Sequence, residues 1–542
     1  MSYMRCLFNR SCGINSNKCT FIKIGIGLVF LLALLAVNNG WAQEYQWTHV
    51  LGSTERDRAT SVTTDSEGNF YVLGYFLKTV DFDPATGIFD IALRTAEEDD
   101  GHNGFVAKYD PSGDFKWVRA VKGPGTIETK DIISDGNDNI YITGKFYYEF
   151  QIGDSDTITS EYSDNIFLAK LDTEGNVQWK TYAGEDGLIL VNNLSIDHNE
   201  NVYLTGTYER EMQVFSADGE SDYISTQENV EPFYAKFSPK GDLINTYTYE
   251  SGTVNHGYDV AFDSKGNMYF ASSFANSVTL ELNNREQIYK PKGLRDGMIQ
   301  KFNSAGQLSE VIIIGNKGEE DITNLMFDKN DNLYLSGYFQ GQSDFNPGPG
   351  QDIISSNGGV DGFLTKLDSD LNYKWTVKLR GNNGDNIFAK EISNGVMYLV
   401  GNFSGQIDFD PGPQQDIRSS QGSKTDVFIY KTALDGEYIN TMTYGGAGWD
   451  KPNDIDFHQG NMYVAGSFEG NADLAPGSEQ DMKESLGDED IFFQKYSIST
   501  SSVKEKPFET DVKLYPNPVN DKLKINLGKA YGNVNVRVSN LL

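Results

Sequence analysis

Aspartates at a fixed position in four related segments are the residues of this sequence most suited to chemistry. Asp81, Asp344, Asp408 and Asp473 each lie ten residues after a tyrosine of a repeated motif. The fullest versions, Asp81-Phe-Asp-Pro84 and Asp408-Phe-Asp-Pro-Gly-Pro413, add a second carboxylate at Asp83 and Asp410. Clustered carboxylate and carbonyl oxygens are the ligands that Ca²⁺ prefers. The pattern therefore predicts that calcium is ligated by residues of this set: Asp81, Asp83, Asp344, Asp408, Asp410 and Asp473.

Two other interpretations of these segments stay open. An Asp-x-x-Pro-Gly stretch is also typical of a turn, in which Asp accepts hydrogen bonds from nearby backbone amides and Pro fixes φ. The segments lack the complete D-x-[DN]-x-[DN]-G loop of an EF-hand. Alternatively, Phe82, Phe345 and Phe409 are exposed and recognise a glycan or a protein, although the same rings could pack inward.

A second set of aspartates precedes the repeated tyrosine at a nearly constant spacing. Its members are Asp57, Asp321, Asp385 and Asp450, and the spacing is one position longer for the first than for the others. At the start of an innermost strand they are expected to line the mouth of a central channel and to contribute to a ligand-binding face. An aspartate that opens a strand after a Gly-rich crossing is ordinary loop chemistry, whereas paired carboxylates in a channel could hydrolyse glycosides.

Other catalytic features are scarce. The chain has five histidines, and no two of them share a motif. It contains no H-E-x-x-H, Walker loop or nucleophile elbow. We therefore assign no catalytic residue and expect a binding protein rather than an enzyme. An enzyme would need one repeat that breaks the pattern, and the segment 247–295, with His256 and Arg285, deviates most.

The elements that must position these residues recur along the chain. A Gly/Asn turn followed by an x-Tyr-x-x-Gly strand occurs seven times at a nearly constant interval. The aligned residues are Tyr71, Tyr141, Tyr203, Tyr269, Tyr334, Tyr398 and Tyr463. A later strand in every repeat carries a lysine, from Lys108 to Lys495, for which we predict a structural role. A fixed period of this kind indicates a repeat architecture.

Four strands per repeat predict an all-β fold, a seven-bladed β-propeller over residues 43–497. In the first repeat the strands are expected at 59–62, 69–74, 104–109 and 115–120. The last repeat lacks its fourth strand, and residues 45–51 at the start of the mature chain supply one. This offset closes a ring, whereas a solenoid would gain nothing from it. In a ring, the long connections after second strands share one face with the crossings between blades.

The repeats resemble a bacterial propeller family with G-N-x-Y-V-x-G and D-x-F-V-A-K-x-D motifs. Asn69-Phe-Tyr-Val-Leu-Gly74 and Gly104-Phe-Val-Ala-Lys-Tyr109 carry the resemblance, which extends over most of the span 43–497. What it implies is the fold, because the members of such families differ in function.

Residues 1–42 are predicted to be a signal peptide. A basic segment precedes the apolar run Ile24–Val37, and small residues at Gly40 and Ala42 suit cleavage before Gln43. An uncleaved anchor is the alternative. All three cysteines lie in this leader, so a cysteine metal or redox site is excluded in the mature chain.

The C-terminal region has a different pattern. Residues 498–511 are expected to be a linker, and 512–542 a small β-module that resembles the C-terminal sorting domain of the Bacteroidetes type IX secretion system. The matching residues are Tyr515, Pro516, Asn517, Pro518, Leu523 and Ile525. Because such domains normally continue for several more strands, this one is either truncated or incomplete.

The charge of the chain limits its partners. The formal net charge is −32, and it becomes more negative once the basic leader is removed. Such a surface repels nucleic acid and anionic membranes. We therefore expect a secreted or outer-surface monomer, without a membrane span in its mature form, that meets the type IX machinery and binds a glycan or protein. A polysaccharide-degrading enzyme and a calcium-stabilised structural surface protein are the alternatives.

Overall fold

The computed structural model describes residues 43–83, 90–91, 101–162, 164–185, 187–357, 359–477, 480–498, 513–515 and 524–526. Residues 45–497 form one compact unit, and residues 1–44 together with 498–542 form another. In the second unit the described part is a hairpin of β42 (Lys513–Tyr515) and β43 (Lys524–Asn526). The predicted leader, linker and most of the tail module lie outside the described residues. Within the described ranges no helix is long and apolar enough to span a membrane.

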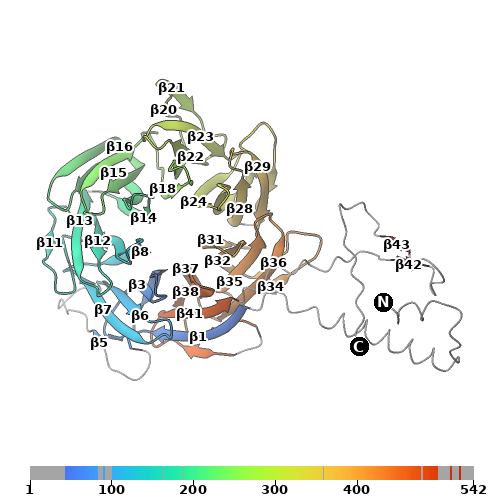
Figure 1. Ribbon diagram of the computed structural model, residues 1–542, viewed down its shortest axis with the longest axis horizontal. Helices are drawn as coiled ribbons and strands as arrows, with labels where there is room; N and C mark the ends of the chain where they lie inside the picture. Colours follow the sequence, from blue (N-terminus) through green and yellow to red (C-terminus); the bar gives the residue numbers. More distant parts are fainter. Residues whose placement is uncertain are drawn as a thin grey trace, which may run out of the picture. The chain divides into compact units, whose positions relative to one another are not determined.

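The larger unit is an all-β propeller, whose sheets are arranged around a central axis (Figure 1). Each sheet is built on a run of four antiparallel strands, which we call a blade and number along the sequence. Blades 1 to 3 are β2 (Arg58–Thr64), β3 (Phe70–Phe76), β6 (Asn103–Tyr109) and β7 (Phe115–Lys122); β8 (Glu128–Ser134), β9 (Ile140–Phe146), β12 (Asp164–Leu171) and β13 (Val177–Glu185); and β14 (Ile189–Ile196), β15 (Val202–Phe215), β16 (Ser221–Phe237) and β17 (Leu243–Thr248).

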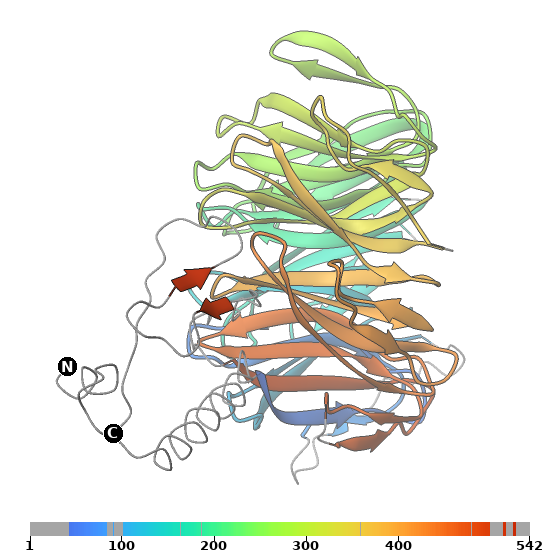
Figure 2. The ribbon, with the colours of Figure 1, turned by 90° about the vertical axis from the view of Figure 1, so that its right-hand side faces the viewer.

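Blades 4 to 7 repeat this order. They are β18 (Gly257–Phe262), β19 (Met268–Phe274), β22 (Asp296–Phe302) and β23 (Leu308–Ile314); β24 (Glu319–Phe327), β25 (Leu333–Gln340), β28 (Asp361–Leu367) and β29 (Tyr373–Lys378); β31 (Asn386–Ser393), β32 (Val396–Ser404), β35 (Thr425–Ala433) and β36 (Tyr438–Gly446); and β37 (Lys451–His458), β38 (Asn461–Phe468), β41 (Asp490–Ile498) and β1 (Gln43–Leu51). Figure 2 shows the sheets from the side.

The N-terminal strand completes the last blade. β1 pairs with β41, so that residues from the two ends of this unit share one sheet. The Trp47 ring lies 6.1 Å from the Phe493 ring and 5.8 Å from the Phe70 ring, so it contacts both the last blade and the first. The strand that the sequence predicts to close the ring is therefore in the predicted place.

Short strands link several blades to the next. The crossing after the fourth strand pairs with the connection that follows the next blade's second strand, as in β7–β10, β13–β15, β30–β33 and β36–β39. The β13–β15 pairing joins blades 2 and 3 into one eight-stranded curved sheet. These short strands are β4 (Val80–Asp81), β5 (Asp90–Ile91), β10 (Glu149–Ile152), β11 (Ile158–Thr159), β20 (Val278–Leu282), β21 (Arg285–Tyr289), β26 (Gln342–Asp344), β27 (Ile353–Ser355), β30 (Arg380–Gly381), β33 (Gln406–Asp408), β34 (Ile417–Ser419), β39 (Asn471–Asp473) and β40 (Met482–Glu484).

The hydrophobic core lies between neighbouring blades. One cluster combines Phe70 and Phe105 of blade 1 with Tyr463 and Phe493 of blade 7, all at most 2% exposed. Other clusters join blades 1 and 2, 2 and 3, and 5 and 6 in the same way. Both faces of each sheet are thus covered, which explains why the strands read as nearly continuous apolar runs rather than alternating ones.

Candidate functional site

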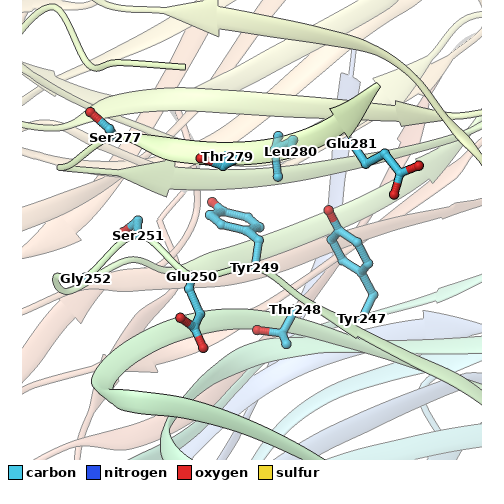
Figure 3. Close-up of a pocket in the computed structure, with 10 residues that line it drawn as sticks. All are labelled: Tyr247, Thr248, Tyr249, Glu250, Ser251, Gly252, Ser277, Thr279, Leu280 and Glu281. Carbon is cyan, nitrogen blue, oxygen red and sulfur yellow. The ribbon is translucent and has the colours of Figure 1, made fainter. Parts of the chain in front are cut away.

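A groove lies where blade 3 crosses to blade 4 (Figure 3), and its volume is about 570 Å³. One wall is the end of β17 and the crossing that follows it. The other wall is β20, the first strand of a hairpin that projects from the ring (Figure 1). The lining residues are Tyr247, Thr248, Tyr249, Glu250, Ser251, Gly252, Ser277, Thr279, Leu280 and Glu281.

The hairpin has a local cause in the sequence. Asn283 and Asn284 connect β20 to β21 with φ values of 53° and 59°. Asparagine tolerates this left-handed region, and two such residues form the turn that suits the twist of a hairpin. This loop occupies the place of the acidic segments in blades 1, 5, 6 and 7. It falls in the segment that the sequence marks as most deviant, although Arg285 and His256 do not line the groove.

Two tyrosines form the fixed part of the groove. The Tyr247 hydroxyl donates to Gln300 Oε1 at 2.5 Å, and its ring stacks on Tyr234 at 5.1 Å. Tyr249 is 5% exposed, and its hydroxyl donates to Ser272 Oγ at 2.9 Å. Burial raises the pKa of both hydroxyls, so they stay neutral. Because both hydroxyls are engaged, the rings are held at defined orientations.

Polar groups surround these rings. Glu250, in the crossing after β17, and Ser277, Thr279 and Glu281, at and in β20, are exposed, and Figure 3 shows both carboxylates directed away from the backbone that carries them. A buried carboxylate, that of Glu231, holds the crossing from blade 3 to blade 4 in place. Glu231, 0% exposed, accepts hydrogen bonds from the Ser251 amide (2.8 Å) and the Asn255 side chain (2.7 Å). The groove therefore offers hydroxyl and carboxylate groups beside aromatic rings on a rigid support.

A second cavity, of about 350 Å³, lies among the innermost strands. Each innermost strand carries a β-bulge at the same place, and Asp131, Asp259 and Asp454 follow the bulges of β8, β18 and β37. Each of the three accepts a hydrogen bond from a backbone amide of another innermost strand: Leu194 (2.7 Å), Leu325 (2.6 Å) and Val62 (3.0 Å), respectively. These bonds tie non-adjacent parts of the chain together at the axis.

Burial perturbs the charges of this cavity. It raises the pKa of Asp454 to about 7 and that of Glu391 to about 8. It lowers the pKa of Lys390 to about 7, an effect that the nearby Asp259 carboxylate opposes. Sequence reasoning missed these residues, because a bulge is what turns them toward the axis and the tyrosine register does not reveal it.

The acidic segments of the rim form turns. Asp344 Oδ1 accepts hydrogen bonds from the amides of Asn346 (3.2 Å) and Asp352 (2.9 Å). The same pair of bonds recurs two and eight residues after Asp408 and after Asp473. Asp81 accepts a bond from the Asp83 amide, and Asp410 one from the Gly412 amide. In the part of the chain that the structure describes, no group of three or more His, Cys, Asp or Glu is placed to hold a metal ion. Pro84 lies outside that part.

The aromatic residues of these segments are buried, so the interpretation in which they are exposed is wrong. Phe82 and Phe345 are 0% exposed and Phe409 is 1% exposed. Their rings pack on Phe105, Phe363 and Phe428, with ring centres 4.8, 4.7 and 5.2 Å apart. The segment folds back over its own blade, and the ring fills the space above the third strand.

The second set of aspartates does not line a channel mouth. Asp57, Asp321, Asp385 and Asp450 are all 0% exposed. The amides of Asp57, Asp385 and Asp450 donate to carbonyls of the preceding blade, at Glu489 (2.7 Å), Val360 (3.0 Å) and Thr425 (2.9 Å). These three residues thus lie in the junctions between blades, where neighbouring sheets cover them.

Asp321 occupies a different position. The amide that makes the equivalent bond is that of Glu320, to the Arg295 carbonyl at 2.9 Å. Asp321 instead accepts hydrogen bonds from the Arg295 guanidinium (2.6 Å) and the Tyr258 hydroxyl (2.8 Å). Blades 6 and 7 have shorter first turns, Asn394-Gly395 and Gln459-Gly460, and this shortens their spacing to the tyrosine by one residue. A constant spacing to the tyrosine therefore matches Asp321 with Asp385 and Asp450, whereas in the structure Glu320 is the equivalent residue.

The proposed sorting motif is described only in part. The backbone of Tyr515 belongs to β42, which pairs with β43. Pro516, Asn517 and Pro518 lie outside the described residues.

The chain has limited similarity to known proteins. No protein-family model matches the chain. An alignment over 202 residues, covering 33% of this chain and 14% of the relative, is 27% identical to an uncharacterized WD repeat-containing protein of Acanthamoeba polyphaga mimivirus. Virginiamycin B lyase from Staphylococcus aureus is similar over 84% of this chain and 99% of its own, with 6% identity and a TM-score of 0.36. An exotype rhamnogalacturonan lyase is similar over 83% and 91%, with 10% identity and a TM-score of 0.24. The chain is a β-propeller repeat protein, similar at a distance to these lyases.

Proposed function

We propose that this chain is an exported, non-enzymatic propeller of seven blades that binds a glycan in the groove between blades 3 and 4. The seven four-stranded runs and the pairing of β1 with β41 support the count and the closure. Export rests on the apolar leader, and the type IX route rests on the tail segment around Tyr515. A secreted or outer-surface location follows from these two features.

The composition of the groove carries the proposal. Sugar rings present apolar C–H faces that pack on aromatic rings, and hydroxyls that bond to carboxylates and to other hydroxyls. Tyr247, which is partly exposed, supplies the aromatic surface, and the buried Tyr249 supports the groove behind it. Glu250, Glu281 and Thr279 supply the polar groups. Binding sites are typically concave, with a few polar groups on a rigid support. The groove is more polar than a docking site for an apolar peptide, which favours the glycan over a protein ligand.

The hydrolase alternative loses the carboxylates on which it depended. Asp321 and Asp385 are fully buried: Asp385 lies in the junction between blades 5 and 6, whereas Asp321 lies in β24 and is engaged by Arg295. A hydrolase of glycosides needs two carboxyl groups that flank a bound sugar within about 5–10 Å. Within the described residues this pair does not meet that requirement, so binding without turnover is the function we favour.

A glycan-array screen of the full chain, followed by calorimetry on the best ligand, tests this function. The double variant Glu250→Gln/Glu281→Gln is expected to weaken binding at least tenfold, since it replaces two charged acceptors by neutral ones. Thr279→Trp is expected to abolish binding by filling the groove. The matched control Glu67→Gln/Glu220→Gln removes two exposed carboxylates elsewhere and should leave the affinity unchanged. Binding that survives both groove variants would place the ligand at another site, and depolymerisation of the glycan by the chain would end the non-enzymatic proposal.

A further inference from the structure

A pair of buried carboxyl groups occupies four consecutive blade junctions. One member lies at the start of the third strand of a blade, five residues before the repeated lysine, and the other lies at or just before the start of the first strand of the next blade. The pairs are Asp296–Glu320, Asp361–Asp385, Asp426–Asp450 and Asp490–Asp57, and every member is at most 2% exposed. In all four junctions, the amide of the second member donates to the carbonyl just before the first member, which places the two side by side.

The remaining junctions have neutral residues at one or both of these positions. Between blades 3 and 4 the pair is Glu231–Asn255, and the Asn255 side-chain amide donates to the Glu231 carboxylate at 2.7 Å. Between blades 1 and 2 and blades 2 and 3 the first member is Asn103 or Asn165, followed by Ile127 or Ile189. The fold therefore does not require two acids at a junction, and four junctions carry them in addition to what the architecture needs.

In two of the acidic junctions both carboxyl groups have an oxygen without a hydrogen-bond partner, whereas in the other two only Glu320 Oε2 and Asp490 Oδ1 do. Asp426 Oδ2 accepts a hydrogen bond from the Gln421 amide (3.0 Å) and Asp450 Oδ2 one from the Gly446 amide (2.6 Å), whereas the Oδ1 atoms of both have no hydrogen-bond partner. Both side chains contact Gly445 closely: a Cβ atom at this position would lie 3.0 Å from Asp426 Cγ and 2.6 Å from Asp450 Oδ2. Glycine at this position leaves the space that the two carboxyl groups share.

The junction between blades 5 and 6 has the same arrangement. Asp361 Oδ2 accepts a bond from the Asn357 amide (2.8 Å) and lies 3.4 Å from Lys378 Nζ, but Asp361 Oδ1 has no hydrogen-bond partner. Neither oxygen of Asp385 has a well-formed hydrogen bond, although both lie against Gly381. Burying a carboxylate without compensation is costly, and burial raises the pKa of Asp385 and of Asp450 to about 8. Each pair is therefore stable only if it holds a proton or binds a cation.

We propose that the pairs Asp426–Asp450 and Asp361–Asp385 each bind a calcium ion in the junction between blades. The free oxygens are carboxylate oxygens, the hard ligands that Ca²⁺ takes in flexible numbers, with main-chain carbonyls and water completing its shell. No ion pair of Asp426 or Asp450 with a lysine or arginine occurs in the described residues, and one lysine lies beside the other pair. An ion in each junction ties two neighbouring sheets together. This role differs from that of the rim aspartates, whose oxygens accept amide bonds.

Metal analysis and thermal unfolding of the full chain test the proposal. Purified protein dialysed against low calcium is expected to retain two Ca²⁺ ions per chain by mass spectrometry of metals. EDTA should lower the melting temperature by at least about 5 °C, and Ca²⁺, but not equimolar Mg²⁺, should restore it. Because an ion that binds only the folded state stabilises it by mass action, the melting temperature should rise with the Ca²⁺ concentration.

Variants assign the ions to the junctions. Asp450→Asn and Asp385→Asn are each expected to reduce the calcium content by one ion per chain, and the double variant should lose the response to EDTA. Asp488→Asn, an exposed carboxylate beside the junction of blades 7 and 1, is the matched control and should keep both ions. If Asp385→Asn or Asp450→Asn fails to fold, Asp361→Asn and Asp426→Asn serve the same purpose. Protein without bound calcium and without a response to EDTA would overturn the proposal, as would calcium that all four variants retain.

Discussion

Lys170 Nζ lies 4.8 Å from the centre of the Tyr141 ring and donates to the Tyr141 hydroxyl at 2.8 Å. The same lysine makes a 2.9 Å ion pair with Asp135, in the turn that precedes the tyrosine strand. A lysine lies over the repeated tyrosine in every blade, at 4.8 to 5.7 Å, in the pairs Lys108–Tyr71, Lys170–Tyr141, Lys236–Tyr203, Lys301–Tyr269, Lys366–Tyr334, Lys431–Tyr398 and Lys495–Tyr463. The predicted structural role of this lysine is confirmed.

Blade 6 offers a natural contrast, because its short turn carries no aspartate at the position of Asp135. Lys431 is 2% exposed, burial lowers its pKa to about 7, and no ion pair with a carboxylate is found for it in the described residues. We expect Lys170→Met to lower the free energy of unfolding by about 3 kcal/mol, since it leaves the Asp135 carboxylate buried and unpaired. Lys431→Met should change it by less than about 1 kcal/mol or increase it. Urea unfolding of the two variants measures the difference, and equal losses would contradict this explanation.

Because β1 closes the ring, a substitution of a partly buried contact residue in β1 is expected to lower the free energy of unfolding strongly. Trp47→Ala removes an aromatic ring that contacts both Phe493 and Phe70, and is expected to cost about 2 kcal/mol or more. Trp449 is 40% exposed and Lys424 and Lys451 lie over its ring, so Trp449→Ala should cost at most about 1 kcal/mol. Denaturant unfolding and limited proteolysis provide the comparison. If Trp47→Ala lowers the free energy of unfolding no more than Trp449→Ala does, β1 adds little to the closure of the ring.

Variants of a rim aspartate can distinguish a role in a turn from a role in binding calcium. Asparagine retains the side-chain oxygen that accepts amide bonds, but not the charge that calcium requires. If Asp408 acts as a turn residue, Asp408→Asn should be neutral, whereas Asp408→Ala should cost about 1 kcal/mol by leaving two amides without their acceptor. Thermal unfolding with and without EDTA gives the answer. A response to EDTA that Asp408→Asn removes would restore the calcium interpretation for this segment.

The central cavity predicts a dependence of stability on pH. Glu391 has a pKa of about 8 in the folded state, because of burial and the negative charges of Asp456 and Asp454, whereas in an unfolded chain its pKa has the ordinary value of 4.5. The stability that this proton confers is complete below about pH 4.5 and is lost as the pH rises through 8. Lys390 has the opposite sign, since its lowered pKa favours the folded state only as the pH rises from 7 toward 10.5.

Glu391→Gln should therefore stabilise the protein at pH 8, by about 1–3 kcal/mol, and have little effect at pH 4. Unfolding in urea at intervals from pH 4 to 9 measures the profile, with Glu67→Gln as the exposed control. A difference between Glu391→Gln and the parent that is the same at every pH would contradict the assignment.

Much of the fold follows from the sequence because the features that specify it are local. The Asp-x-x-Gly-Asn turns, such as Asp65 with Asn69, are closed by bonds four residues apart, and the tyrosine strand follows at once. Strand type, strand number and the closing role of residues 45–51 can be predicted from such signals. The groove lies in the segment whose pattern deviates most, although nothing in the sequence indicates which of its residues form the walls.

The sequence by itself determined the repeat, its strands and its turns. The tertiary structure decided which acids meet. Asp426 and Asp450 belong to consecutive blades and become neighbours only because one blade ends beside the start of the next. The first turns of blades 6 and 7 are one residue shorter than that of blade 5, so the spacing in the sequence matched Asp321, and not Glu320, with Asp385 and Asp450. A β-bulge in β8 set the direction of the Asp131 side chain. Such shifts reverse the face to which a strand residue points, and their effect is fixed by pairing with distant strands rather than by the residues beside them.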